Sequence, residues 1–350
     1  MPQDGKTLRL NAAKAADVRR AAEILRGGGT VAFPTETVYG LGANALDTIA
    51  VGKIFAAKQR PSWDPLIVHV VDGAAANELA MLEGDVRTRA MSLMEAFWPG
   101  PLTLLLPRTS AVPDAVTAGR PRVGVRVPHH QVAMELIRLA GVPIAAPSAN
   151  RFGRTSPTTA AHVLEDLEGR IDAVLDGGPT TVGVESTVLD VCESPMVIYR
   201  PGAVTREMIA CAAGDVRDFE TVPSDAEPES LPSPGVGLRH YAPRARLVLI
   251  RETAADVRGS LVGAIGRESC SHVGLMLPAG WSASGAGSVF DWGPWEDREV
   301  LAHRLFDGLR TLDEAGAEVI LCPLPDAGGL GDALRDRLEK AARVKAEPDR

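Results

Sequence analysis

The stretch FPTETVYGLG, residues Phe33–Gly42, restricts the fold and function of this chain more than any other stretch. Residues 30–33 have the composition of a buried strand, and Pro34 ends it. Two threonines flank Glu36, and Tyr39 and two glycines complete the stretch. Small polar groups at the end of a buried strand, followed by glycines that permit close approach, predict a loop that holds a small ligand.

The bulk composition predicts a two-domain protein of the cytosol. The chain has 350 residues, which is long for one hydrophobic core. No apolar run reaches the length of a membrane span, and the first ten residues lack the hydrophobic region of a signal peptide. The cysteines have no spacing typical of a metal or redox site, so we expect reduced thiols. They are Cys192, Cys211, Cys270 and Cys322.

The charges are unevenly distributed along an acidic chain with a formal net charge of −8. Residues 1–210 contain 21 Lys and Arg against 22 Asp and Glu, so most of the negative charge lies in the remaining residues. The same 210 residues contain 17 Arg and 4 Lys, and Arg suits fork-shaped recognition of phosphate and carboxylate. The overall acidity argues against tight, non-specific nucleic-acid binding, although a local basic groove stays open.

Residues 1–213 alternate helices and strands in the manner of an α/β domain with a mixed sheet. The helix expected over 15–26, for example, places four apolar residues on one face and ends at three glycines. The order of the strands does not follow from one sequence. The expected helices cover residues 15–26, 48–58, 74–81, 85–97, 131–139 and 158–167, and the expected strands cover residues 30–33, 66–71, 103–106, 123–127, 144–146, 173–175, 187–191 and 197–200.

The composition changes after residue 213. Residues 214–244 contain five prolines, several acids and few large apolar side chains, which is typical of an interdomain linker. Residues 245–350 then form a second α/β domain. Its expected strands cover 247–250, 273–277 and 319–321, and its expected helices cover 296–315 and 332–344.

Lys58 and Arg60 lie at the end of an expected helix, before a turn bounded by Pro61 and Pro65. Two interpretations are open. Cations are favourable at a helix C-terminus because of the helix dipole, which would be a structural role. Alternatively, both side chains project into one pocket and bind phosphate or carboxylate, and the prolines make their loop rigid.

Two polar residues interrupt apolar strands. His69 is expected on the face of Ile67, and a single strand histidine is more often a satisfied core residue than a catalytic one. Arg126 lies on the strand face opposite the valines of its strand. Arginine in such a position is usually solvated, but together with Gly124 it could instead form a pocket floor that binds a carboxylate through two hydrogen bonds.

Further polar groups lie at strand ends. Ser148 and Asn150 follow a strand of small residues, and Ser156 or Thr155, ahead of Pro157, is expected to cap the next helix. That cap leaves Ser148 and Asn150 without a structural explanation, and their position favours anion binding. Ser186 precedes another strand, and Arg200 ends the strand after that, where it could contact a phosphate.

The sequence contains no Walker-type loop, nucleophile elbow, zinc-ligand spacing or dinucleotide fingerprint. The expected chemistry is therefore positioning and charge neutralisation. A divalent metal would be bound mainly through substrate phosphates.

Five motifs in this order resemble those of the threonylcarbamoyl-AMP synthase family. They are PTETVYGLG from residue 34, Lys-x-Arg at Lys58 and Arg60, Ser-x-Asn at Ser148 and Asn150, STVLD from residue 186 and YRPG from residue 199. The resemblance covers nearly the full length, because HYAP at residues 240–243 matches an element of the family's long form. It implies an α/β fold in which a YrdC-like domain with a twisted mixed sheet precedes a smaller Rossmann-like C-terminal α/β domain.

The resemblance implies an enzyme, a nucleotidyltransferase. Members of the family condense L-threonine, bicarbonate and ATP into threonylcarbamoyl-adenylate and release pyrophosphate, and we expect Mg²⁺ to arrive with ATP. The product is used to modify the adenosine beside the anticodon of certain tRNAs. The implied partners are therefore these small molecules and the tRNA threonylcarbamoyl transferase machinery, without a membrane, and a weak contact with tRNA or double-stranded RNA stays open.

The resemblance also implies a role for each matching residue. The residues implied for L-threonine are Thr37, His69, Arg126, Ala146 and Ser186. The residues implied for ATP are Arg60, Asp64, Arg122, Ser148, Ser156, Arg200 and Tyr241. The residues implied for catalysis are Lys58, Arg60 and Asn150. Among them, Arg126 is the expected partner of the threonine carboxylate, and Lys58 is expected to offset charge on carbonate or phosphate.

Two residues depart from the family pattern. Asp64 stands where the family commonly has Asn, so a carboxylate faces the nucleotide unless a metal or cation compensates it. Arg122 replaces a usual small polar residue, so only a backbone role is expected there. We further expect the linker around Tyr241 to close over the nucleotide and exclude water.

Two other functions stay open. Carbamoyl transferases of hydrogenase maturation contain the same domain, but the acylphosphatase and zinc-finger segments of those proteins are not recognised in this sequence. An RNA-binding module would use the concave positive surface of such domains, which the charge count disfavours. The oligomeric state does not follow from the sequence, and neither does a role for the C-terminal domain beyond a lid or docking part.

Overall fold

The computed structural model describes residues 5–220, 233, 241–251, 272–282 and 287–343, and it divides into two compact units. The first unit comprises Met1–Phe152 and Ser156–Gly237, and the second comprises Gly153–Thr155 and Leu238–Arg350. Most of the predicted linker, residues 214–244, lies outside the described residues, as do Cys270 and the histidine of the HYAP element.

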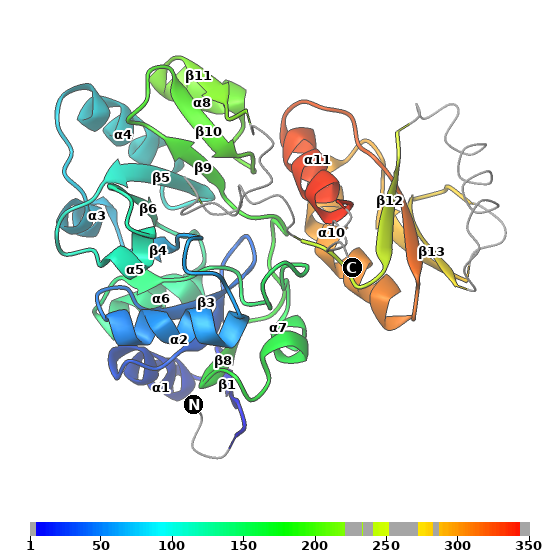
Figure 1. The fold of residues 1–350 in the computed structure, drawn as a ribbon, viewed down its shortest axis with the longest axis horizontal. Coiled ribbons are helices and arrows are strands. Elements are labelled where there is room, and N and C mark those ends of the chain that lie inside the picture. The colour runs from blue at the N-terminus through cyan, green and yellow to red at the C-terminus, as the bar shows by residue number, and fades with distance from the viewer. Residues whose placement is uncertain (1–4, 221–232, 234–240, 252–271, 283–286, 344–350) are drawn as a thin grey trace, which may run out of the picture. The chain divides into compact units, whose positions relative to one another are not determined.

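A mixed sheet forms the centre of the first unit (Figure 1). Among the described residues its order is β1-β8-β2-β3-β7-β4-β6-β5-β9-β10-β11. β4 runs parallel to β6, whereas β5 runs antiparallel to β6, so the predicted mixed α/β sheet is confirmed. The strands are β1 (Leu8–Asn11), β2 (Val31–Pro34), β3 (Tyr39–Asn44), β4 (Ile67–His69), β5 (Leu102–Pro107), β6 (Arg122–Arg126), β7 (Ile144–Ala145), β8 (Ala173–Asp176), β9 (Thr187–Asp190), β10 (Met196–Arg200) and β11 (Val216–Asp218).

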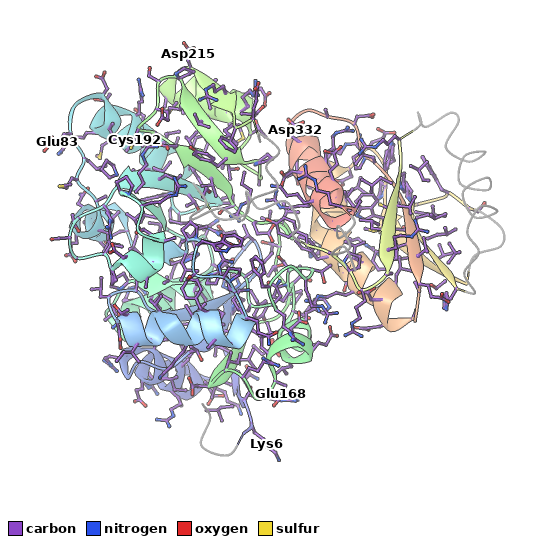
Figure 2. All side chains as sticks on the ribbon, in the orientation of Figure 1. Lys6, Glu83, Glu168, Cys192, Asp215 and Asp332 are labelled. Carbon is purple, nitrogen blue, oxygen red and sulfur yellow. The ribbon has the colours of Figure 1, made fainter. Side chains whose placement is uncertain are left out.

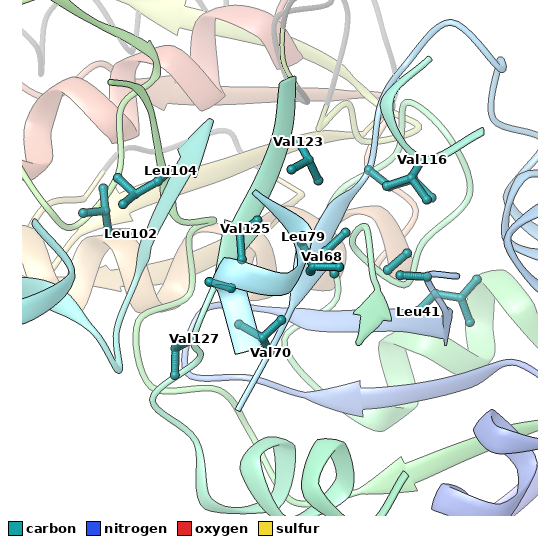
Figure 3. Packing of buried hydrophobic residues seen from close by; sticks show 14 of the residues in the cluster. Leu41, Val68, Val70, Leu79, Leu102, Leu104, Val116, Val123, Val125 and Val127 are labelled. Carbon is teal, nitrogen blue, oxygen red and sulfur yellow. The ribbon is translucent and has the colours of Figure 1, made fainter. Parts of the chain in front are cut away.

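Helices cover both faces of this sheet because its central strands are apolar on both sides. Phe33 of β2 packs in one core with residues of α1 and α6, whereas the neighbouring Ala32 packs in another core with residues of α2, α3 and α4. Val123 and Val125 of β6 belong to that second core and are fully or almost fully buried (Figure 3). The helices are α1 (Ala15–Arg26), α2 (Thr48–Lys58), α3 (Gly73–Leu79), α4 (Gly84–Phe97), α5 (Asp114–Thr117), α6 (Gln131–Ala140), α7 (Ala160–Leu167) and α8 (Arg206–Ala213).

Helix α2 begins and ends at the predicted residues because its two termini have strong local signals. The Asp47 carboxylate accepts hydrogen bonds from the backbone N–H groups of Ile49 at 2.9 Å and Ala50 at 3.2 Å. Gln59 follows Lys58 in the left-handed conformation, with φ of 55°, and ends the helix. Lys58 is therefore fixed at the last position of the helix.

The stretch Phe33–Gly42 is a β-hairpin, so the predicted ligand loop is wrong for its second half. β2 pairs with β3 in antiparallel fashion from Val31 opposite Gly42 to Pro34 opposite Tyr39. The turn between the strands is closed by the Thr35 hydroxyl, which donates to the carbonyl of Val38 at 2.7 Å. The alternation of a strand is hidden in the sequence because two of the first four residues of β3 are glycines.

The two glycines of β3 permit close packing between strands. A Cβ atom on Gly42 would lie 2.8 Å from a ring carbon of Phe33 and 2.8 Å from a methyl carbon of Ile144. A Cβ atom on Gly40 would lie 3.3 Å from the Cβ atom of Ala146. The glycines thus bring β7, and the residues after it, close to the hairpin.

The second unit contains a parallel sheet, which confirms the predicted Rossmann-like C-terminal fold. The order among its described strands is β12-β15-β13-β14. α10 and α11 pack on one face of the sheet (Figure 1). The elements are β12 (Arg246–Ile250), β13 (Val273–Pro278), β14 (Ser288–Gly293), α10 (Arg298–Glu314), β15 (Val319–Pro323) and α11 (Leu330–Ala341).

Glu83 and Asp215 are examples of charged side chains that lie at the periphery of the first unit (Figure 2). A group of charged side chains is buried, although burying a charge is costly unless the charge is compensated. These residues are Glu36, Lys58, Asp64, Arg126, Asp166, Glu185, Asp190 and Arg200. No helix in the described part of the chain is both long and apolar enough to cross a membrane.

Candidate active site

Arg126, at the end of β6, lies at the centre of one buried polar cluster and is 3% exposed. Its guanidinium donates to the hydroxyl of Thr37 at 3.1 Å and to the carbonyl of Gly100 at 3.1 Å. It also forms an ion pair with the Glu36 carboxylate at 2.6 Å. The structure therefore brings together Thr37 and Arg126, two of the residues that the resemblance implies for L-threonine.

Glu36 compensates the charge of Arg126. Burial by itself raises the pKa of Glu36, but the charge and the hydrogen bonds of Arg126, with help from backbone N–H groups, hold this pKa below its ordinary value. Glu36 is therefore ionised near neutral pH, and the pair is formally neutral.

His69 lies beside Arg126 because β4 and β6 pair in register at these two residues. The imidazole is 4% exposed, and its ring meets the ring of Phe33 edge-on with centroids 6.2 Å apart. Burial, and then the positive charge of Arg126, lower the pKa of His69 from 6.5 to about 3. The imidazole is thus neutral near pH 7, and its Nδ1 has no hydrogen-bond partner among the described residues.

Ser186 and Ala146 are the remaining two residues that the resemblance implies for binding L-threonine. The Ser186 hydroxyl is hydrogen-bonded to the hydroxyl of Thr103 at 2.8 Å and accepts from the guanidinium of Arg200 at 3.1 Å. Ala146 follows β7, and its backbone N–H donates to the carbonyl of Ile67 at 2.9 Å. Ser186 therefore also contacts Arg200, one of the residues predicted for ATP.

Lys58 lies at the centre of a second buried cluster and is 1% exposed. Its ammonium group donates to the carbonyl oxygens of Ser148 and Asn150, each at 2.5 Å. Burial, and then the charge of Arg60, lower the pKa of Lys58 well below its ordinary value, while Asp64, Asp166 and Glu185 raise it. The Lys-x-Arg and Ser-x-Asn motifs thus meet in space, and the contact runs from side chain to backbone.

Arg60 and Asp64 form a buried ion pair next to Lys58, with 2.8 Å between Nη2 and Oδ1. The guanidinium of Arg60 also donates to the carbonyls of Asp64 at 3.2 Å and Pro65 at 2.8 Å. Burial raises the pKa of Asp64, whereas Arg60, Lys58 and Arg200 lower it. The carboxylate that departs from the family pattern is therefore compensated by a neighbouring cation.

The hydroxyl of Ser156 donates to the Glu185 carboxylate, so the predicted helix-capping role of Ser156 is wrong. Thr159 caps α7 instead, because its hydroxyl accepts from the backbone N–H of His162 at 3.3 Å. Pro157 had suggested an earlier helix start, but α7 begins at Ala160.

The side chains of Arg122 and Tyr241, two residues that the resemblance implies for ATP, contact other side chains of the protein. Arg122 forms ion pairs with Asp190 and, at 2.7 Å, with Glu193, so its side chain has a structural role. This agrees with the expectation that at most its backbone contributes to a ligand site. Tyr241 belongs to the second unit, where its ring packs against Phe306 with centroids 5.7 Å apart.

The sequence motifs did not identify the acidic partners of these clusters. Glu36 lies within the PTETVYGLG motif and Glu185 directly precedes STVLD, but the motifs predict no cationic or hydroxyl partner for either acid. The positions of these two acids in the sequence nevertheless contain a signal. Glu36 lies two residues after β2 and Glu185 lies two residues before β9, so each acid stands near a strand end, and a buried acid requires a cation or a donor nearby.

Two clusters of buried cations on a mixed α/β sheet, followed by a unit with a parallel sheet, define a class of anion-binding α/β enzyme. Two family models match the chain, "Telomere recombination" over residues 23–202 and "Threonylcarbamoyl-AMP synthase, C-terminal domain" over residues 204–343. The chain belongs to the two-domain threonylcarbamoyl-AMP synthase family.

The relatives agree with this assignment over nearly the whole chain. Threonylcarbamoyl-AMP synthase of Pyrococcus abyssi is 43% identical over 93% of this chain and 94% of its own length. The Bacillus subtilis protein of the same name is 42% identical over 93% of this chain and 92% of its own length. The crystal structure of P. abyssi Sua5 complexed with L-threonine matches with a TM-score of 0.86 and 41% identity, over 96% of this chain and 97% of that one.

Proposed function

We propose that this chain condenses L-threonine, bicarbonate or CO₂, and ATP into threonylcarbamoyl-AMP with release of pyrophosphate. The strongest support from the geometry is the pair of buried cationic clusters in one unit, around Arg126 and around Lys58. Ser186 and Glu185, which are adjacent in the chain, contact Arg200 and Ser156 respectively and so connect the two clusters.

The Arg126 cluster is the proposed threonine site. A guanidinium with a hydroxyl and a carboxylate beside it can bind both the carboxylate and the ammonium group of an amino acid. Arg126 would take the carboxylate of threonine, and the ionised Glu36 would balance the ammonium. Neutral His69 and the hydroxyls of Thr37 and Ser186 supply hydrogen bonds for the side-chain hydroxyl.

The Lys58 cluster is the proposed nucleotide site, with Arg60, Ser148, Asn150, Ser156 and Arg200 as its members. Within the described residues no group of three or more His, Cys, Asp or Glu side chains could hold a metal ion. Mg²⁺ would therefore be bound through the phosphates of ATP and would neutralise charge there. The chain's own contribution is the orientation of the phosphates by Lys58, Arg60 and Arg200.

The proposed reaction has two steps. The ammonium group of threonine first releases a proton to the solvent. The resulting neutral amine attacks bicarbonate or bound CO₂ and gives N-carboxy-threonine, with loss of water or of a proton respectively. An oxygen of the new carboxylate then attacks the α-phosphorus of ATP, and the bond to pyrophosphate breaks. The chain holds two anions together for the second step, and the charges of Lys58 and the neighbouring arginines reduce their repulsion.

We further propose that the product is transferred to the machinery that modifies tRNA next to the anticodon, in the cytoplasm. The decisive experiment measures pyrophosphate release by the purified full-length protein. Release should require ATP, threonine and bicarbonate together. Release that is indifferent to threonine would overturn the proposal, and a salt-dependent RNA gel shift without any adenylate formation would favour an RNA-binding module instead.

A further inference from the structure

A pocket of about 290 Å³ opens on the first unit beside the end of β4. Val70 and Val71, which directly follow β4, line it together with residues of α3 and of the C-terminal half of α6. Among the described residues of its lining, none belongs to the proposed threonine site or to the proposed nucleotide site. The proposed function therefore leaves this pocket unexplained.

The walls of the pocket are apolar because it lies where the two hydrophobic cores of the first unit meet. Val70 and Leu79 belong to the core that contains residues of α2, α3 and α4. Ile137 belongs to the core that contains residues of α1 and α6, and Val71 and Val142 pack against that core. A ligand in the pocket would thus contact aliphatic side chains from both layers.

Small residues leave the space between these walls open. Ala75 on α3 and Ala111 line the pocket with a single methyl group each, and Gly141 has no side chain. Gly141 ends α6 in the left-handed conformation, with φ of 66°, which glycine adopts at little cost. The exposed Leu46 adds a large apolar side chain to the lining. A larger side chain in place of Ala75 would occupy the pocket.

Two charges of opposite sign belong to the otherwise apolar lining, Glu78 on α3 and Arg138 on α6. The carboxylate of Glu78 has no hydrogen-bond or ion-pair partner in the described part of the chain. Arg138 forms an ion pair with Glu135 of its own helix at 2.8 Å. A guanidinium has five N–H donors, so this pair leaves donors for a ligand. The pocket therefore offers one charge of each sign next to an apolar surface.

The size and the lining restrict the class of ligand. Pockets for small molecules span about 300 to 1000 Å³, so this one lies at the small end of the range and suits a molecule smaller than a nucleotide. Aliphatic walls offer no hydrogen-bond partner to a buried hydroxyl, which disfavours threonine. An amino acid with an aliphatic side chain matches the volume, the walls and both charges.

We propose that this pocket binds a small aliphatic amino acid of the leucine or isoleucine class. Its ammonium group pairs with Glu78, its carboxylate pairs with Arg138, and its side chain packs against Val70 and Ile137. Both charged residues are exposed, and exposed ion pairs contribute little free energy. Most of the affinity therefore comes from burial of the aliphatic side chain, and the charges select a zwitterion. The proposal goes beyond the proposed function and does not depend on it.

The first test titrates the full-length protein with L-leucine and follows the ligand by NMR, with and without excess L-threonine. We expect saturable binding with a Kd of about 1 mM or tighter, and no displacement by threonine. Leucinamide lacks the carboxylate and N-acetyl-leucine lacks the ammonium group. Each should bind about threefold more weakly than leucine, as expected for the loss of one exposed ion pair.

Filling the pocket should remove most of this binding. Ala75→Leu places an aliphatic side chain where the ligand's own side chain would lie, and we expect the Kd for leucine to rise at least about 10-fold. The matched control is Ala74→Leu, because Ala74 is the preceding residue of α3 and is exposed. This control should leave the Kd for leucine unchanged.

Surface variants keep the proposal testable if Ala75→Leu does not fold. Glu78→Gln and Arg138→Gln should each raise the Kd for leucine about threefold. Their controls are Glu23→Gln and Arg20→Gln on α1, where the same kind of ion pair joins residues three apart at 3.3 Å. The Arg20 side chain is 61% exposed and the Arg138 side chain 62%, so the two arginines are closely matched. Both controls should keep the wild-type Kd.

The outcomes decide the proposal without reference to catalysis. Leucine binding that weakens in the three pocket variants and persists in the three controls supports it. Absence of saturable binding of leucine and isoleucine up to about 10 mM overturns it. Displacement of leucine by threonine also overturns it, because leucine would then occupy the threonine site. Equal binding of leucine, leucinamide and N-acetyl-leucine overturns the assignment of a zwitterion. Loss of pyrophosphate release by the wild type would bear on the proposed function alone.

Discussion

Arg126 and Lys58 are both buried cations of the first unit, but their charges are compensated in different ways. Arg126 is paired with the carboxylate of Glu36 at 2.6 Å, so the pair is neutral. The ammonium of Lys58 instead donates hydrogen bonds to the carbonyls of Ser148 and Asn150. Carbonyl dipoles stabilise a cation without cancelling its charge.

This difference fits the two binding sites that we propose within one unit. A neutral ion pair with fixed geometry suits the recognition of a small zwitterion, since it offers one charge of each sign. A cation held by dipoles, in a cluster with Arg60 and Asp64, suits an anion that changes its charge distribution during the reaction. Variants of Lys58, Arg126, Glu36 and His69 test this contrast.

Replacing Lys58 by methionine should lower kcat for pyrophosphate release about 100- to 1000-fold, because a positioned charge at the reacting phosphate is lost. KM for threonine should change little. The control is Lys53→Met in the same helix, since Lys53 donates to the carbonyl of Gly28 at 2.6 Å outside the site. Steady-state kinetics measures both. A Lys58→Met variant with more than about a tenth of the wild-type kcat would contradict a role in the reaction step.

Removing the Arg126 ion pair should instead affect threonine binding. The double variant Arg126→Met/Glu36→Gln avoids leaving a buried charge unpaired. We expect KM for threonine to rise about 10- to 100-fold, because one charge-assisted hydrogen bond to the substrate is lost. KM for ATP should be nearly unchanged. Calorimetric titration with threonine gives the same quantity without turnover. A variant that loses ATP affinity instead would reverse the assignment of the two clusters.

The Lys58 cluster could be predicted from the sequence more completely than the Arg126 cluster. Lys58 stands at the end of a helix whose limits follow from Asp47 and Gln59, and Ser148 and Asn150 follow a recognisable strand. Local rules therefore placed both halves of the contact at element ends. The sequence did not predict that Lys58 contacts the backbone carbonyls of Ser148 and Asn150, because these motif residues are recognised by their side chains.

The partners of Arg126 and Ser156 could not be predicted because they depend on pairing between distant strands. Glu36 follows β2 and Arg126 ends β6, and the strands β3, β7 and β4 lie between these two in the sheet. The same limit explains why the sequence predicts a loop where β3 lies, since the glycines of β3 are required by Phe33 and Ile144 on neighbouring strands. Propensity at a single position contains no information about such neighbours.

Glu36→Gln should lower the free energy of unfolding by about 3 kcal/mol at pH 7, because it leaves the buried Arg126 without its counter-ion. The folded-state pKa of Glu36 lies below its ordinary value of 4.5. The ion pair therefore stabilises the wild type above about pH 4.5, and this contribution is lost as pH falls through the folded pKa. Urea unfolding at several pH values should show the two proteins converging below pH 4.5. A difference that stays constant down to pH 3 would mean that the lost energy is not the ion pair.

The smallest expected effect concerns His69, which lies beside the Arg126 pair. Because its pKa falls from 6.5 to about 3 on folding, the unfolded chain takes up a proton below pH 6.5 and the folded protein does not. The wild type should therefore lose about 1 kcal/mol more stability between pH 7 and pH 5.5 than His69→Asn does.

Urea unfolding at these two pH values measures that difference, and the exposed His129 provides the control. His129→Asn should keep the wild-type dependence on pH. If His69→Asn keeps it as well, His69 is not held neutral by burial and by Arg126. The Arg126 cluster would then tolerate a further positive charge, and the contrast between a neutral cluster for threonine and a cationic one for phosphate would no longer hold.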